Sequence, residues 1–154
     1  MSDEIGSFDN KGLLQLLKAL KDSAPVARVG VLGGKDIRKN SDSNATIGMK
    51  HEFGQEGMPI RSFLRTPLID QMQNALDKSN AFTEDVAKDI IKQGSFTHWV
   101  RKLEMVAEEV IAEAFKTGGF GKWKPSNMFF KTVHQTLVET TQLRDSITSE
   151  VKEG

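Results

Sequence analysis

The sequence contains no cysteine and no tyrosine among its 154 residues. Without cysteine the chain has no disulfide, no thiolate nucleophile and no zinc–sulfur site, and the absence is compatible with a reducing cytoplasm. No apolar run approaches the ~20 residues needed to cross a bilayer. The first residues, MSDEIGSFDN, are acidic and polar, unlike a signal peptide. We therefore expect no membrane partner.

The chain also lacks an excess of either charge. Its 21 Lys and Arg balance its 21 Asp and Glu, so the formal net charge is zero. Nothing in that balance attracts nucleic acid to the molecule as a whole. Neutrality does lower the electrostatic barrier to self-association, which favours the subunit of an assembly.

Familiar catalytic motifs are missing as well. His51-Glu52 begins like the metalloprotease motif His-Glu-x-x-His, but position 55 is Gln and Gly54 is expected to end the helix. His98 and His134 are isolated, and neither a Gly-x-Ser-x-Gly elbow nor a phosphate-binding loop is present. Four glutamates on the longest expected helix are interpreted as a solvated face: Glu104, Glu108, Glu109 and Glu113. We therefore predict no catalytic residue, no metal site, no cofactor and no enzymatic activity.

What the chain does contain is a regular spacing of apolar residues. This spacing predicts helices at 8–22, about 45–53, about 63–78, 83–94 and about 97–117, a shorter helical segment at 127–135, and strands within 26–34 and after Arg144. No internal repeat or linker divides these segments. We therefore predict a single α+β domain over 1–154, with a small antiparallel or mixed sheet packed against several helices.

Local signals refine this picture at the helix ends. Asn44 and Ser62 are expected as N-caps, and Gly54 fits the left-handed position after a helix. The longest helix has an apolar face formed by Trp99, Leu103, Val106, Val110 and Ala114, flanked by Val100, Ala107, Ile111 and Phe115. The polar segment 35–44 has nothing apolar to bury, so we predict a mobile loop that orders on assembly, with Lys35, Arg38 and Lys39 as candidate contacts.

Two blocks of the sequence resemble a known family, and the first of them consists of two neighbouring segments. Residues 47–54 and 58–65 read IGMKHEFG and MPIRSFLR, and together they resemble the signature of the tail-completion proteins of tailed bacteriophages. The matching residues are His51, Glu52, Phe53, Gly54, Pro59, Arg61, Phe63, Leu64 and Arg65. Met58, Ile60 and Ser62 stand where this family usually has Ile, Ala and Pro.

A second block, further along the chain, resembles the same family. WKPSN and LVETTQLRDSI match at Trp123, Pro125, Ser126, Leu137, Thr140, Leu143, Arg144, Ser146 and Ile147. Thr141 replaces the usual Gly. The two blocks, in the same order, extend the resemblance over most of the chain.

The resemblance implies a structural virion protein, assembled in the host bacterial cytoplasm and located in the tail or neck of the virion. Its expected partners are copies of itself in a ring, as a hexamer, the tail tube protein and the head connector or stopper protein, with DNA passing through the lumen. The expected role is to join the tail to the head connector. A tail terminator, which caps the tube and fixes its length, is the alternative within the virion. An alternative from another class is a nucleic-acid-binding protein that uses the basic loop and Trp123.

Roles for individual residues follow from the first block as hypotheses. Gly54 and Pro59 would fix the direction in which the chain leaves the short helix. Phe53 and Phe63 would anchor this region in the core. Arg61 and Arg65 would either pair with Glu52 or reach a neighbouring subunit.

Overall fold

The computed structural model describes residues 10–22, 25–36, 42–124 and 141–152. Its elements follow in the order α1 (Asn10–Asp22), β1 (Val26–Val31), the 3-10 helix η1 (Gly33–Asp36), α2 (Asn44–Phe53), α3 (Arg65–Ser79), α4 (Glu84–Gln93), α5 (Thr97–Thr117), α6 (Gln142–Asp145) and β2 (Ile147–Lys152). The helices and the antiparallel strand pair confirm the predicted α+β class, including the long helix at 97–117. No described helix has both the length and the apolarity needed to cross a membrane.

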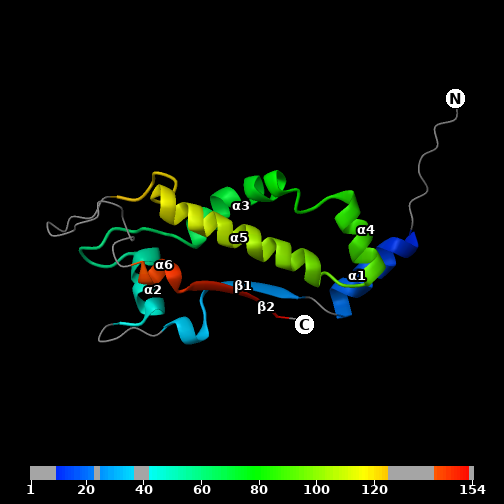
Figure 1. Cartoon of the computed structure of the whole chain (residues 1–154), viewed down its shortest axis with the longest axis horizontal. Helices are drawn as coiled ribbons and strands as arrows, with labels where there is room; N and C mark the ends of the chain where they lie inside the picture. Colours follow the sequence, from blue (N-terminus) through cyan, green and yellow to red (C-terminus); the bar gives the residue numbers. More distant parts are fainter. Residues whose placement is uncertain (1–9, 23–24, 37–41, 125–140, 153–154) are drawn as a thin grey trace, which may run out of the picture.

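The sheet pairs β1 with β2, which are far apart in the sequence, in antiparallel register with Val31 opposite Ile147. Because side chains alternate between the faces of a strand, Val29, Val31 and Ile147 share the face that packs against buried residues of α5. Arg28 and Glu150 fall on the other face, where their side chains lie 3.8 Å apart. Figure 1 shows α5 running along one face of the strand pair.

The rest of the fold packs around α5, which contacts α3 as well as both strands. Its buried residues are Val100, Val106, Ala107, Val110, Ile111, Ala114 and Phe115. The predicted apolar face is thus confirmed in the centre of the helix, whereas Trp99 and Leu103 are only half-buried. Gly118 ends the helix in the left-handed conformation, with φ 65°, and its N–H donates to the carbonyl of Ala114.

Two buried clusters lie toward opposite ends of α5. One joins α4 to the start of α5 and consists of Val86, Ile90, Phe96 and Val100. The other lies near the end of α5 and consists of Phe63, Ile111, Phe115 and Leu143. Figure 1 shows the resulting elongated arrangement, with α1 and α4 at one end and α2 and α6 at the other.

Several expectations about helix ends are wrong in detail. The N-cap of α2 is Ser43, whose hydroxyl accepts from Thr46 N, and Asn44 is the first helical residue. Gly54 has φ 81° and ψ 163°, an extended conformation open only to glycine and not the left-handed helical one. The short helix α6 was not expected, and the helical segment predicted at 127–135 lies outside the described residues.

The segment predicted as a loop, 35–44, is ordered at both of its described ends. Lys35 and Asp36 belong to η1 and Asn44 to α2. The Asn44 side chain donates to the carbonyl of Lys35 at 2.8 Å, and Asp36 Oδ1 accepts from Ala45 N at 2.6 Å. These bonds fasten η1 to the start of α2. Arg38 and Lys39 lie outside the described residues.

Candidate functional site

The two blocks of the sequence that carry the family resemblance lie together in space. We call their meeting point the α2–α3 corner: the end of α2, the returning segment 54–64 and the start of α3, with Trp123, Lys124 and Leu143 packed against them. In Figure 1 this corner lies at the end of the molecule where α2 and α6 meet the end of α5.

The centre of the corner is the carboxylate of Glu52, which is buried with 5% of its surface exposed. Its Oε1 accepts from Ser62 Oγ at 2.6 Å and from the backbone N–H of Arg65 at 2.9 Å. Its Oε2 accepts from the backbone N–H groups of Phe63 at 2.9 Å and Leu64 at 3.1 Å. A negative group is stabilised at a helix N-terminus by the unpaired N–H groups and the helix dipole. Glu52 of α2 therefore caps α3.

Ser62 takes part in this cap, but its prediction as the N-cap residue is wrong, because α3 starts at Arg65 and not at 63 and its N-cap residue is Leu64. The Ser62 hydroxyl donates to Glu52 and accepts from Thr66 N at 2.8 Å. The next residue, Pro67, has no N–H, and Leu68 N already donates to the carbonyl of Leu64. Every backbone donor at the start of α3 therefore has an acceptor, as a buried helix end requires.

A tight turn brings Ser62 back to Glu52. Gln55 and Met58 form a two-residue bridge, and Arg61 N donates to the carbonyl of His51 at 2.8 Å. A Cβ at Gly54 would lie 2.8 Å from the side-chain atom Ile60 Cγ1, so a larger residue would displace the Ile60 side chain. This supports the predicted role of Gly54 in directing the chain; Pro59 lies half-buried in the returning segment.

The second block enters the corner through Trp123. Its indole Nε1 donates to the carbonyl of Ser62 at 3.0 Å, and its ring packs edge-on against Phe115 at 5.6 Å. Beside it, Arg61 Nε donates to the carbonyl of Lys124 at 3.0 Å. Burial lowers the pKa of the Arg61 guanidinium from its ordinary value, and only 6% of the residue is exposed. The Nε of Arg61 thus bonds to a backbone carbonyl of its own chain.

Phe63 is confirmed as a core anchor, whereas the same expectation for Phe53 is wrong. Phe63 is 1% exposed and stacks at 5.3 Å from Phe115. Phe53 is 59% exposed, because α2 turns Asn44, Gly48 and Glu52 inward instead of an apolar stripe. The exposed Phe53 ring lies 5.1 Å below the guanidinium of Arg65.

Small size at position 48 is what lets α2 approach the core. A Cβ on Gly48 would lie 3.2 Å from Phe63 Cζ and 3.4 Å from Leu143 Cδ1. Sequence reasoning missed this residue, because a glycine in a helix is locally unfavourable and carries no functional signal by itself.

The remaining basic residues of the two blocks lie at the surface. Arg65 Nε is 3.8 Å from Glu52 Oε1, so Arg65 follows the predicted pairing within the subunit. Arg144 is exposed, and its Nε donates to Asp145 Oδ1 at 2.9 Å. A hydrogen bond from Thr141, followed by that from Arg144, holds the pKa of Asp145 below its ordinary value. Pro125 lies outside the described residues.

The chemistry open to the corner is limited by these bonds. Four donors already occupy the two oxygens of Glu52, so the carboxylate is not presented to a reactant. No group of three or more His, Asp or Glu side chains converges within the described part of the chain. Of the four glutamates expected on a solvated face, Glu108 and Glu109 are exposed, and Glu104 and Glu113 are half-buried. Glu104 and Glu108 also reach β2, at 2.6 Å and 2.5 Å from the hydroxyl of Ser149.

Comparisons with protein-family models, with curated proteins and with solved structures found no match. The resemblance to tail-completion proteins therefore stays a prediction. Of the residues on which it depends, Glu52, Phe63, Trp123 and Leu143 lie together in the α2–α3 corner, and Pro125, Ser126, Leu137 and Thr140 lie outside the described residues.

Proposed function

We propose that this chain is a structural virion protein of a tailed bacteriophage. In this proposal it is a subunit of a ring at the head-proximal end of the tail, joins the tail to the head connector and has no enzymatic activity. One observation carries the proposal: the hydrogen bond from Trp123 to the carbonyl of Ser62 joins the two separate blocks that resemble the tail-completion family. Residues that lie 61 positions apart act as one structural unit, as expected of a fold signature.

The use of these residues also supports a structural role. Glu52 caps a helix, Phe63 and Leu143 fill the core, and Trp123 closes the corner. Each of them stabilises the backbone of the subunit. Such a subunit requires complementary surfaces for its neighbours and no nucleophile.

The sheet supports assembly as well. Within the described residues, β1 and β2 pair only with each other, so each strand has an outer edge without a partner strand. A free edge exposes a row of N–H and C=O groups that pair readily with another chain. A ring forms when two different surfaces of neighbouring subunits meet head to tail and the rotation closes. The tail tube protein and the connector protein would then meet the two rims of the ring.

The DNA contact in this proposal is confined to the lumen of the ring. Lys35 is exposed on η1, and it would face the passing DNA together with Arg38 and Lys39. The contacts of Trp123 disfavour a nucleic-acid-binding protein that stacks bases on this ring, because the indole already packs against Phe115. The neighbouring Lys122 pairs with Asp70 at 2.6 Å.

The test is electron microscopy of lysates from a phage in which this gene is deleted, with the gene supplied in trans as the control. Full heads beside separate tails of uniform length are the expected result. Tails of irregular, extended length would instead assign the chain as a tail terminator. Normal infectious virions without the gene would refute both virion roles.

A further inference from the structure

The helix α1 leaves an apolar face in solvent. Leu13, Leu14 and Leu17, which we call the leucine stripe, are 39%, 65% and 50% exposed. The same helix, NKGLLQLLKALKD, contains three lysines and one aspartate, so the stripe is surrounded by positive charge. Apolar residues on one side of a helix normally mark the side that is buried against something.

A cavity with apolar side chains in its lining lies where α3 passes into α4. It has a volume of about 450 Å³ and is lined by Gln73, Leu76, Asp77, Asn80, Phe82 and Trp99; we call it the aromatic cavity. Phe82 is 63% exposed and meets Trp99 edge-on at 5.6 Å. Asp77 is the charged residue of this lining, and Glu84 and Asp85 follow in the first turn of α4. The lining therefore combines the apolar side chains of Leu76, Phe82 and Trp99 with the polar side chains of Gln73, Asp77 and Asn80. Of the nearby carboxylates, Glu84 pairs with Lys88 at 2.7 Å, whereas Asp85 is exposed.

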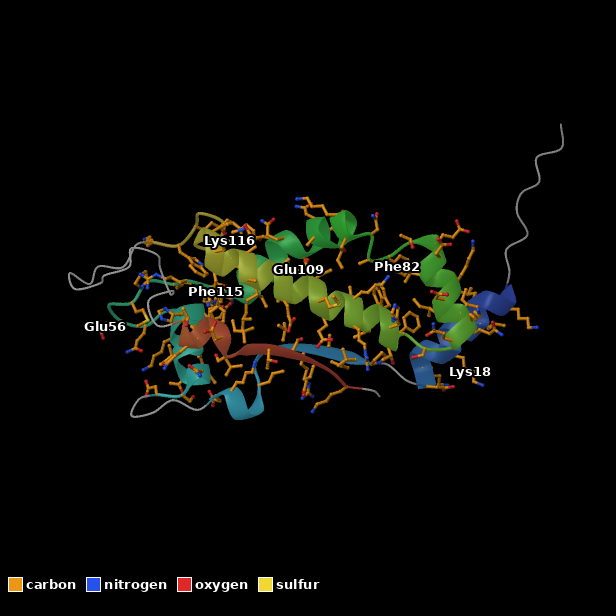
Figure 2. The ribbon with its side chains drawn as sticks, in the orientation of Figure 1. Lys18, Glu56, Phe82, Glu109, Phe115 and Lys116 are labelled. Atoms are coloured by element: carbon orange, nitrogen blue, oxygen red, sulfur yellow. The ribbon has the colours of Figure 1, made fainter. Side chains whose placement is uncertain are left out.

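The leucine stripe does not reach the aromatic cavity of its own chain. Lys18 and Asp22 of α1 line a hollow with Gln93 and Gly94, at the C-terminal end of α4. Phe82 precedes the N-terminal end of that helix, and a helix of ten residues is about 15 Å long. Figure 2 shows Phe82 and Lys18 near opposite ends of α4.

We propose that the leucine stripe of one copy docks into the aromatic cavity of a second copy of this chain. Leu14 and Leu17, three residues apart, project side by side about 5–6 Å from each other and enter the cavity together. Lys18 and Lys21 then face Asp77 in the lining and Asp85 in the first turn of α4, and this complementarity of charge selects the second copy as the occupant.

The two surfaces differ, so the contact is head to tail and repeats from copy to copy. The inference rests on the proposed function in one respect, because it names a contact that could close the ring. Apart from that, the proposed contact requires only that the free protein associates with itself.

The absence of native cysteine makes the contact directly testable by disulfide trapping in the full-length protein. Leu14→Cys protein and Phe82→Cys protein are mixed and oxidised, and a mixture of Leu14→Cys with Met105→Cys is the control. Met105 is equally exposed, at 61%, and lies outside both surfaces. We expect a cross-linked dimer from the first mixture at roughly ten times the yield of the control. Equal yields, or efficient cross-linking of Leu14→Cys with itself, would overturn the proposal.

Sedimentation of matched variants gives a second, independent measurement. Leu14→Ala/Leu17→Ala and Phe82→Ala should each weaken self-association about tenfold or more, with Met105→Ala unchanged. Lys18→Glu/Lys21→Glu should also weaken it, and Asp77→Lys in a mixed partner should restore it. Melting temperatures identify any variant that fails to fold. Association that is insensitive to the leucines, or a charge reversal without rescue, would place the contact elsewhere.

The two proposals fail separately. Specific cross-linking together with normal virions from the deletion phage would remove the tail role and keep the contact. Separated heads and tails without specific cross-linking would keep the tail role and require a different ring interface.

Discussion

Replacement of Glu52 by alanine tests how the α2–α3 corner is held together. The change leaves three backbone N–H groups and the Ser62 hydroxyl without their acceptor. Loss of a helix cap costs about 0.5–2 kcal/mol, and each buried donor left unpaired costs about 1–3 kcal/mol. Water can replace the carboxylate at exposed Arg65, whereas Phe63 is only 1% exposed. We therefore expect Glu52→Ala to lower the free energy of unfolding by about 3–5 kcal/mol.

Glu52→Gln should lower the free energy of unfolding by about 2 kcal/mol, less than Glu52→Ala does. One side-chain oxygen remains as an acceptor, while the other is replaced by an amide N–H₂ that faces backbone donors. Glu56→Gln is the matched control: Glu56 is exposed in the same turn, as Figure 2 shows, and its replacement should stay within about 0.5 kcal/mol.

The assay is thermal and urea unfolding, followed by far-UV circular dichroism and by tryptophan fluorescence. For a chain of this size, the expected loss in Glu52→Ala lowers the melting temperature by roughly 10 °C. If Glu52→Ala melts within a degree or so of Glu56→Gln, the carboxylate does not hold the start of α3, and the structural interpretation of the His-Glu pair is wrong.

Three further predictions separate the roles of residues in the corner, each measured by unfolding of the free subunit. Phe63→Ala should lower the free energy of unfolding by about 3–5 kcal/mol and Phe53→Ala by less than about 1 kcal/mol, since only Phe63 is buried. Equal losses in the two variants would contradict this assignment. Arg61→Ala should lower the melting temperature of the subunit itself, because its guanidinium bonds within the chain; lost assembly with unchanged melting would instead indicate an interface. Gly48→Ala should cost about 1–3 kcal/mol through the 3.2 Å approach of its methyl group to the Phe63 ring; a more stable variant would show that the ring moves freely.

Under the proposed function, joining a tail to a head would place a mechanical load on the subunit, and the α2–α3 corner is suited to resist it. The capped start of α3, the returning segment and Trp123 are tied by hydrogen bonds from three separate parts of the chain. Breaking one of these bonds leaves a buried polar group unpaired, so the corner resists partial opening. A rigid corner would keep neighbouring interfaces in register under the proposed function.

Local patterns in the sequence determined which segments form helices and strands. The spacing of apolar residues predicts a helix at 83–94, and the structure places Thr83 and Gly94 at the two caps of α4. The long helix followed from apolar residues at three- and four-residue spacing and from Gly118. Valines separated by small residues predict β1, and alternation after Arg144 predicts β2. In the two helices the deciding interactions join residues within a few positions of each other, so they are visible in the sequence.

The tertiary structure alone decided how the motif residues are used. Glu52 caps a helix that begins 13 positions further on, and no local capping pattern spans that distance. Whether Phe53 or Glu52 faces inward depends on the packing of α2 over Phe63 and Leu143, where Gly48 makes the close approach. A buried carboxylate is stable solely where donors from elsewhere in the chain converge on it, because the cost of removing its charge from water must be offset by those bonds. That convergence is a property of the folded chain, and the order of residues along it does not reveal it.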